Sequence, residues 1–324
     1  KEKVMNRRGF LGLGAALGAT TMAPSLFAKE NFTMWGAPAI PSVIMAVASM
    51  QGELAKTHDV KLRIWNTPDV LRAGVASGDI KVTMSPSNVA ANLRNQGLNF
   101  AMLNLLTLGV MNAMIKDESI KTLEDFVGKK IIMPFKNDMP DLVLRALCKK
   151  RGIDASKLDI TYTQTPPEAV GLFIQKDYDV LIVPQPLSEA TILRGKKAGV
   201  AVHYGLDFPK TWGESFNAKP YIPMAGIIVN VDYYEANRAL FETLHADLTS
   251  ALEWILENKQ SAAKIGAEYL PAPEPALAGA FDKANLTVTK AHELQDDVMA
   301  FFEQIFEFNP KLLGGKMPDK SLFL

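Results

Sequence analysis

Two patterns of apolar and polar residues alternate along the chain from residue 31 onward. Short runs rich in β-branched and aromatic residues predict strands, and longer stretches with apolar residues every three or four positions predict helices. The expected strands are 32–35, 60–65, 80–84, 100–106, 130–134, 159–162, 179–183, 200–204 and 225–231. The expected helices are 42–54, one that opens at 67–69, 86–95, 138–151, 166–176 and 188–197, with 233–308 nearly all helical. This alternation predicts an α/β fold with mostly parallel sheets.

A polar stretch at 116–128 interrupts the alternation, and a second set of strands and helices follows it. We therefore expect two lobes, each with a mostly parallel sheet flanked by helices. The helical C-terminal segment must pack on one of them, and the simplest arrangement returns the chain to the first lobe near 205–230. This predicts a discontinuous lobe 1 of residues 29–110 and 215–324, a lobe 2 of residues 111–214, and a cleft spanned by two crossings.

Residues 1–28 have the pattern of an export signal. Arg7 and Arg8 precede an apolar stretch rich in glycine and alanine at 12–23, and Ala28 stands at the expected cleavage point. The paired arginines resemble a twin-arginine signal. Because the apolar stretch is shorter than the roughly 20 residues that span a bilayer, removal is favoured over an anchor. We expect a soluble protein in the periplasm.

The charges balance, with 35 basic and 35 acidic side chains, and no basic stripe interleaved with aromatic residues occurs. Since neutralisation of phosphates supplies much of the affinity for nucleic acids, DNA and RNA are not expected partners. Hydrophobic residues make up 48% of the chain, which predicts sizeable buried cores and not disorder. The one cysteine, Cys148, lies in an apolar run and is expected to be a buried hydrophobic side chain.

The sequence lacks the common signatures of catalysis. Its four histidines, His58, His203, His245 and His292, stand apart from one another and from the cysteine, so no metal site is expected. No phosphate-binding glycine loop or nucleophile elbow follows a predicted strand. We expect no catalytic residue, no cofactor and no metal, and a binding protein in place of an enzyme. Two alternatives stay open: an exported, cofactor-dependent redox enzyme, and a solute-sensing subunit of a membrane signalling receptor.

Four segments match one family in order and spacing. They are 122–132 (TLEDFVGKKII), 138–147 (DMPDLVLRAL), 166–170 (PPEAV) and 179–186 (DVLIVPQP). Together they resemble the periplasmic solute-binding proteins of ABC importers in the nitrate, sulfonate and taurine group. The resemblance implies a two-lobed type II binding protein that closes on a small-molecule solute by hinge motion and delivers it to an ABC permease. We expect it to be a monomer. The chain departs from the family at Gln185, where Glu is common.

The loops after the strands are the expected site, because ligands in such sheets bind beyond the carboxyl ends of the strands. The candidate ligand-binding residues are Trp35, Pro38, Ser42, Trp65, Asn66, Ser85, Ser87, Asn104, Lys136, Asn137, Asp138, Gln185 and Met224. Aromatic rings such as that of Trp65 favour stacking on a flat ligand, and Lys136 is the one obvious cation in these loops. The expected solute is a small organic molecule, with a sulfonate or carboxylate group or with a flat heterocycle.

Each of these side chains also has a structural interpretation. The serines and Asp138 precede helices and suit helix caps, and the tryptophans suit packing at the rim of a core. Four methionines near the loops, Met84, Met133, Met139 and Met224, predict an adaptable pocket, and the filling of gaps in the core is the alternative use of each.

Overall fold

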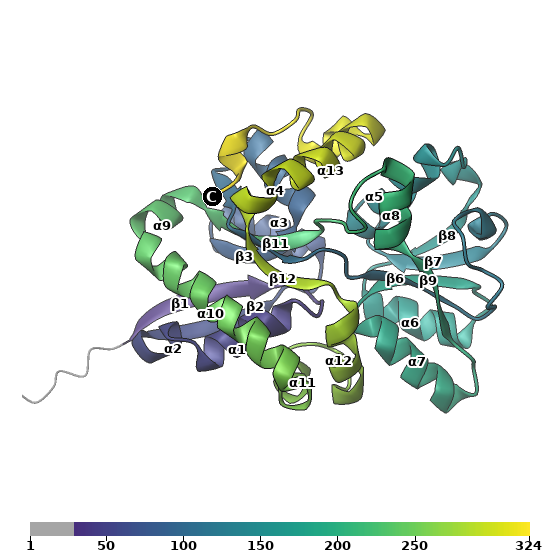
Figure 1. Ribbon diagram of the computed structural model, residues 1–324, viewed down its shortest axis with the longest axis horizontal. Coiled ribbons are helices and arrows are strands. Elements are labelled where there is room, and N and C mark those ends of the chain that lie inside the picture. Colours follow the sequence, from purple (N-terminus) through teal and green to yellow (C-terminus); the bar gives the residue numbers. More distant parts are fainter. Residues whose placement is uncertain (1–28) are drawn as a thin grey trace, which may run out of the picture.

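The computed structural model describes residues 29–324, which form two β-sheets flanked by helices (Figure 1). The first sheet has the order β12-β5-β11-β3-β1-β2, with β4 paired to β11, and the second has the order β10-β6-β9-β7-β8. We call the part around the first sheet lobe 1 and the part around the second sheet lobe 2. The strands of lobe 1 are β1 (Glu30–Gly36), β2 (His58–Ile64), β3 (Val82–Pro86), β4 (Phe100–Met102), β5 (Asn104–Thr107), β11 (Ala225–Asn230) and β12 (Leu286–Lys290). Those of lobe 2 are β6 (Met111–Ile115), β7 (Lys130–Pro134), β8 (Asp159–Thr163), β9 (Val180–Pro184) and β10 (His203–Asp207).

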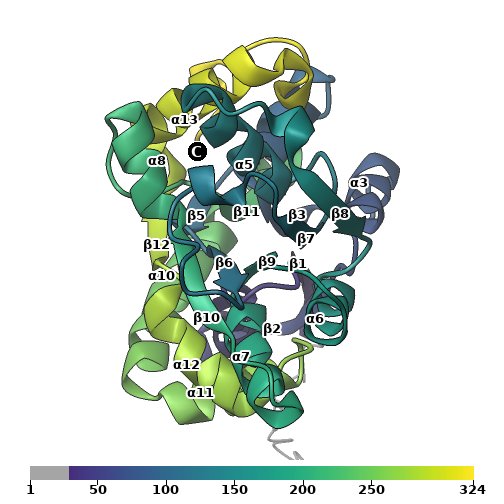
Figure 2. The ribbon, with the colours of Figure 1, turned by 90° about the vertical axis from the view of Figure 1, so that its right-hand side faces the viewer.

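Helices cover both faces of each sheet. Those of lobe 1 are α1 (Ser42–Gln51), α2 (Leu54–Thr57), α3 (Pro68–Ser77), α4 (Ser87–Asn95), α9 (Val231–Ala236), α10 (Arg238–Glu257), α11 (Lys259–Ala267), α12 (Glu274–Ala280) and α13 (Gln295–Phe308). Those of lobe 2 are α5 (Met139–Lys150), α6 (Pro166–Gln175), α7 (Leu187–Ala198) and α8 (Phe208–Phe216). Figure 2 shows α5 and α8 on one side of the lobe 2 sheet and α6 and α7 on the other. Short 3₁₀ helices are η1 (Glu124–Phe126), η2 (Ala155–Lys157), η3 (Phe281–Lys283), η4 (Ala291–Leu294), η5 (Pro310–Leu313) and η6 (Lys320–Leu322). The two-lobed α/β fold is thus confirmed.

Local sequence explains where the helices begin and how deeply they are buried. The Thr67 hydroxyl accepts a hydrogen bond from the Val70 N–H at the start of α3, and Pro68 fills the first turn. Helix α1 packs against α10 and α11 as well as against its own sheet, so eight of its ten residues are buried. Its run of small and apolar residues, SVIMAVAS, suits a helix that faces protein on nearly all sides.

The chain passes between the lobes twice. Residues 108–110 lead from β5 to β6, and residues 217–224 lead from α8 back to β11. All five strands of the second sheet therefore come from one uninterrupted segment, 111–207. The bounds of the two lobes given above stay a prediction.

Three expectations about elements are wrong. The segment 233–308, expected to be nearly all helical, contains strand β12, which pairs with β5 at the edge of the sheet. Residues 208–216, for which no helix was expected, form α8. Strand pairing is also more mixed than expected, with four parallel and six antiparallel pairings. Five of the six antiparallel pairings involve β6 or β11, the strands that follow the crossings, because the chain enters each sheet there against the direction of its neighbours; the sixth joins β12 to β5.

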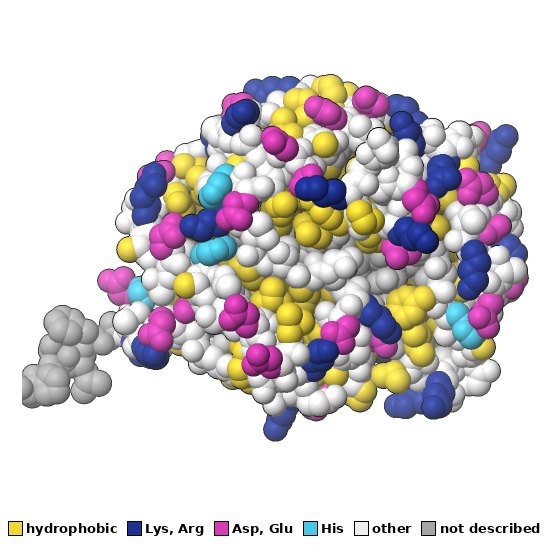
Figure 3. Space-filling view, in the orientation of Figure 1, with side chains coloured by type: hydrophobic (Ala, Val, Ile, Leu, Met, Phe, Trp, Pro, Cys, Tyr) yellow, Lys and Arg dark blue, Asp and Glu magenta, His cyan; other side chains and the backbone are white. Residues whose placement is uncertain are grey.

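The burial of Cys148 and the distribution of charged side chains agree with the sequence. Cys148 is fully buried, and this burial raises the pKa of its thiol to about 12, so it is a core side chain as expected. Basic and acidic side chains are interspersed over the face in Figure 3. Of the helices in residues 29–324, none is long and apolar enough to span a membrane. The predicted export signal, residues 1–28, lies outside the described residues.

Candidate functional site

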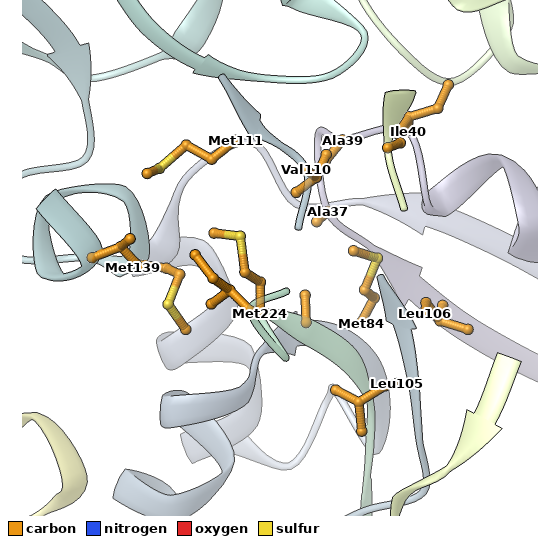
Figure 4. Packing of buried hydrophobic residues seen from close by; sticks show 14 of the residues in the cluster. Ala37, Ala39, Ile40, Met84, Leu105, Leu106, Val110, Met111, Met139 and Met224 are labelled. Atoms are coloured by element: carbon orange, nitrogen blue, oxygen red, sulfur yellow. The ribbon is translucent and has the colours of Figure 1, made fainter. Parts of the chain in front are cut away.

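A cavity of about 80 Å³ lies between the lobes, and we call it the cleft cavity. Lobe 1 and its crossing contribute Ala37, Pro38, Ala39, Trp65, Pro68, Met84, Ser85, Pro86, Val110, Met224 and Ala225. Lobe 2 contributes Met111, Phe135, Asp138, Met139, Pro140 and Pro184. In Figure 4 the side chains of Met84, Met111, Met139 and Met224 lie around the same space between the lobes.

The strand order of the two sheets explains this position. Residues 37–39 follow β1, Trp65 follows β2, and residues 135–140 follow β7, so the walls come from loops at the carboxyl ends of parallel strands. This is the edge at which open α/β sheets bind ligands. The lobe 1 loops and the lobe 2 loops face each other across the cavity.

The walls of the cleft cavity are almost entirely apolar. Two of their polar groups are already bonded within lobe 1: the Trp65 indole N–H donates to the Met84 carbonyl oxygen at 3.0 Å, and the Ser85 hydroxyl donates to the Pro86 carbonyl oxygen at 3.2 Å. Asp138 is the one charged residue among the described residues of the lining. Burial of an unpaired ion between such walls costs free energy, so the cavity favours the apolar parts of a ligand.

Asp138 forms an ion pair across the lobe boundary. The Arg72 guanidinium on α3 donates to Asp138 Oδ2 at 2.8 Å, and the side chains are 48% and 8% exposed, respectively. Burial raises the pKa of Asp138, and the positive charge of Arg72 acts in the opposite direction. The pair joins the two lobes at the rim of the cavity.

The loop that carries Asp138 has an unusual backbone. Phe135 and Asn137 have φ values of 62° and 61°, in the left-handed region that few non-glycine residues adopt. Buried Asp141 stabilises the loop, because its Oδ2 accepts the Asn137 N–H at 2.9 Å and its Oδ1 accepts the Arg145 Nε–H at 2.7 Å. These contacts fix the position of Asp138 against Arg72.

Gln185 connects the lobes but does not line the cavity. Its backbone oxygen accepts the Ile40 N–H of lobe 1 at 2.9 Å, and its Nε2 donates to the Tyr204 hydroxyl at 2.7 Å. Its Oε1 is buried without a hydrogen-bond partner among residues 29–324. Tyr204 in turn bonds Glu189, so Gln185 belongs to a polar network within lobe 2.

Five of the thirteen candidate residues line the cleft cavity. These are Pro38, Trp65, Ser85, Asp138 and Met224.

The other eight candidates lie outside the lining: Trp35, Ser42, Asn66, Ser87, Asn104, Lys136, Asn137 and Gln185. Ser42 and Ser87 at the starts of α1 and α4 donate to carbonyl oxygens of Ala37 and Pro223, at 2.6 and 2.8 Å. Their hydroxyl groups are thus used inside lobe 1.

Four more of these candidates make other contacts or are exposed to solvent. Trp35 packs beside Arg63, whose guanidinium carbon lies 5.6 Å from the centre of the indole ring. The Asn104 side chain accepts the Ile227 N–H at 3.2 Å within the sheet of lobe 1. The Lys136 ammonium group lies 5.5 Å from the centre of the Tyr162 ring. Asn66 is exposed.

Residues absent from the candidate set supply most of the wall. They include small and cyclic side chains such as Ala39, Pro68, Pro140 and Pro184, which carry no chemical signal in a sequence. Met84 and Met139 fit the prediction of a methionine pocket, whereas Met133 is fully buried within β7 and does not line the cavity. In residues 29–324 no group of three or more His, Cys, Asp and Glu side chains is placed to hold a metal ion.

Comparison with known proteins gives a family and a fold. The family model described as NMT1/THI5 like matches residues 56–262. No match was found among curated protein sequences.

Solved structures with this fold are similar over most of their length. An ABC transporter protein from Parabacteroides distasonis has a TM-score of 0.74 at 15% identity, with 91% of this chain and 99% of that chain covered. The periplasmic aliphatic sulphonate-binding protein of Escherichia coli has a TM-score of 0.68 at 17% identity, with 89% and 96% covered. The periplasmic nitrate-binding protein of Synechocystis PCC 6803 has a TM-score of 0.61 at 16% identity, with 76% and 69% covered.

Proposed function

Because the chain belongs to the NMT1/THI5 like family, we propose that it is the extracytoplasmic solute-binding component of an ABC importer. The family model spans strands of both sheets, and the structures with the same fold include sulphonate-binding, nitrate-binding and ABC transporter proteins. These similarities support the class of function, while the solute has to be inferred from the cavity itself.

The observation that carries the proposal is a cavity with walls from both lobes. A solute in the cleft cavity touches Trp65 and Met224 on one side and Phe135 and Met139 on the other. It therefore makes more contacts when the lobes are closed than when they are apart, and a ligand shifts a conformational equilibrium only through such a difference in contacts. Only two crossings join the sheets within residues 29–324, which permits a hinge motion between the lobes.

The size of the cavity indicates a closed arrangement. Its volume of about 80 Å³ is smaller than the roughly 150 Å³ of a dry apolar cavity that holds one benzene molecule. An organic solute thus enters only if the lobes part or the flexible methionines repack. The solute is a small organic molecule whose apolar part packs between Trp65 and the methionines.

Several features complete the proposal. Residues 1–28 direct export and are removed, and the mature protein is a monomer of the periplasm that binds its solute without chemical change and passes it to a membrane permease. Lobe 1 consists of residues 29–110 and 215–324, and lobe 2 consists of residues 111–214. Arg7 and Arg8 support the export route, and the cavity residues support capture over catalysis.

A thermal-shift screen tests this function. Aliphatic and aromatic sulfonates, carboxylates, nitrate and pyrimidines are added to the purified protein, and small-angle scattering follows for each compound that stabilises it. At a concentration about 100 times the Kd, binding to the folded state adds about 2.7 kcal/mol, which raises the unfolding midpoint by about 5 °C. Scattering should then show compaction.

A cavity-blocking variant makes the test specific. Met224→Trp fills the cleft cavity and should abolish the thermal shift, whereas Met50→Trp, at a position 51% exposed on α1, should leave it unchanged. Circular dichroism checks that both variants are folded. A stabilising compound that binds the Met224→Trp variant as tightly as the wild type would contradict the cleft as the site.

A further inference from the structure

A second ion pair joins the two lobes, where α7 of lobe 2 packs against α12 of lobe 1. The Lys283 ammonium group on η3, directly after α12, donates to Glu189 Oε1 on α7 at 2.5 Å. In Figure 2, α7 and α12 lie at the lower left, away from α3 at the upper right, which carries Arg72. We propose that Lys283, Glu189 and Tyr204 form a latch that favours closed lobes in the absence of a solute.

This inference goes beyond the capture of a solute and concerns the equilibrium between open and closed lobes. It rests on the hinge motion of the proposed function, because a latch has an effect only if the lobes can separate.

Glu189 is the centre of the latch. Its carboxylate accepts hydrogen bonds from the Lys283 ammonium group and from the Tyr204 hydroxyl. The Lys283 nitrogen also lies 4.7 Å from the centre of the Tyr204 ring, close enough for a cation–π contact. The side chains of Lys283 and Glu189 are 47% and 15% exposed, so water and salt screen this pair less than a fully exposed one.

Burial raises the pKa of the Tyr204 hydroxyl, and its hydrogen bond to Glu189 acts in the same direction. The hydroxyl therefore stays protonated and donates to the carboxylate.

A glycine on α12 makes room for the carboxylate. A Cβ added at Gly279 would lie 3.0 Å from Glu189 Oε2, which is tighter than an ordinary contact between carbon and oxygen. Lys283 follows this glycine by four residues, on the same side of the lobe boundary. The close approach of α12 to α7 thus places the Glu189 carboxylate within reach of Lys283.

Hydrogen bonds connect the latch to the wall of the cleft cavity. The Gln185 Nε2 group donates to the Tyr204 hydroxyl at 2.7 Å, and the Gln185 backbone oxygen accepts the Ile40 N–H at 2.9 Å. Ile40 directly follows Ala39, which lines the cavity. A latch that holds α7 against lobe 1 therefore also holds the Gln185 backbone against this loop.

One polar group of the same network opposes closure. The Gln185 Oε1 atom is buried without a hydrogen-bond partner among residues 29–324, which costs free energy. Ile40 of lobe 1 packs beside Gln185, so separation of the lobes lets water reach this oxygen. The latch offsets this cost, and loss of its charge should shift the equilibrium toward open lobes.

Double electron–electron resonance tests the latch on the purified protein without any solute. Spin labels are attached to Met50→Cys on lobe 1 and to Val127→Cys on lobe 2, both at exposed positions. The native Cys148 is fully buried, so it does not react with the label. An increase in NaCl to 1 M shortens the Debye length to about 3 Å and should move the distance distribution toward longer distances.

Two variants remove the latch in different ways. Lys283→Gln deletes the charge and should lower the ratio of closed to open molecules about fivefold, with a smaller response to salt. Gly279→Leu displaces the Glu189 carboxylate and should act in the same direction, while leucine suits a helix better than glycine does. Lys130→Gln is the matched control, because Lys130 is also half-exposed and forms a 2.6 Å ion pair with Asp177 inside lobe 2.

The outcomes separate the latch from the capture of a solute. Longer distances in Lys283→Gln and Gly279→Leu, with Lys130→Gln like the wild type, support the latch. If Lys283→Gln keeps the wild-type distances and salt response, the latch is overturned, and the capture of a solute still stands or falls with the thermal-shift screen. Circular dichroism checks that each variant is folded.

Discussion

Replacement of Trp65 by phenylalanine tests the wall of the cleft cavity in stability and in binding. Trp65 is 4% exposed, and its indole N–H donates to the Met84 carbonyl oxygen at 3.0 Å. A phenylalanine at this position has no N–H to make this bond and fills less space. The substitution therefore removes one hydrogen bond and enlarges the cavity.

The two losses have comparable size. A net hydrogen bond contributes about 1 kcal/mol, and a few tens of Å³ of new cavity, at about 24 cal/mol per Å³, add about 1 kcal/mol. The Met84 oxygen keeps a second donor, the Thr83 hydroxyl at 3.0 Å, so the larger penalty for an unsatisfied buried carbonyl does not apply. Trp65→Phe should therefore lower the free energy of unfolding by about 2 kcal/mol.

Urea denaturation measures this loss as a lower midpoint with an unchanged slope, since the compactness of the fold is not altered. Tryptophan fluorescence measures the second effect, because the solute that stabilises the protein should change the emission of the wild type but not of Trp65→Phe. Trp35→Phe is the control, because Trp35 does not line the cavity, and its variant should keep the response. An unchanged unfolding midpoint in Trp65→Phe, or a retained fluorescence response, would refute this reasoning.

Three further predictions concern the fold that holds the site. An added Cβ at Gly226 on β11 would lie 1.8 Å from the backbone oxygen of Asn104, so Gly226→Ala should lower the free energy of unfolding in urea by about 3 kcal/mol; a loss below about 1 kcal/mol would contradict this packing. The pKa of Cys148 is raised from 9.0 to about 12, so the contribution of this thiol to stability is complete below pH 9 and is lost between pH 9 and 12. Between about pH 8 and pH 10.5, the free energy of unfolding in urea should therefore fall by about 2 kcal/mol more in the wild type than in Cys148→Ala, and parallel pH profiles of the two proteins would exclude this. Asp141→Ala leaves the Arg145 guanidinium and the Asn137 N–H without their buried partner and should cost about 3 kcal/mol in the same assay. The control is Asp296→Ala, at an exposed position, which should cost less than about 1 kcal/mol.

The alternation of strands and helices predicted most of the fold because it is local. Strand β1 and helix α3 follow directly from residue patterns and capping residues within one segment. Strand β12 was missed because its pattern, LTVTK, is short and half-buried, and its partner β5 lies about 180 residues earlier in the chain. Pairing at that distance depends on the tertiary structure, which local periodicity does not encode.

The candidate site was harder to predict for a different reason. Polar residues that follow strands are natural candidates for ligand contacts, but the side chains of Ser42, Ser87 and Asn104 form hydrogen bonds with nearby backbone atoms. The cavity walls are instead made by proline, alanine and methionine side chains, which resemble core residues until the two lobes face each other. The pairing of Arg72 with Asp138 likewise joins residues of different lobes, and no pattern along the chain predicts it.

The Arg72–Asp138 pair links closure of the lobes to the affinity for the solute. The pair lies at the rim of the cleft cavity, so separation of the lobes must break it. Other contacts between the lobes lie away from the cavity lining; one is the hydrogen bond from Lys149 to the Glu307 carbonyl oxygen at 2.6 Å. When the lobes close without a solute, the apparent affinity falls in proportion to the fraction of molecules that stay open to bind one. We infer that the affinity for the solute depends on this ion pair as well as on the walls of the cavity.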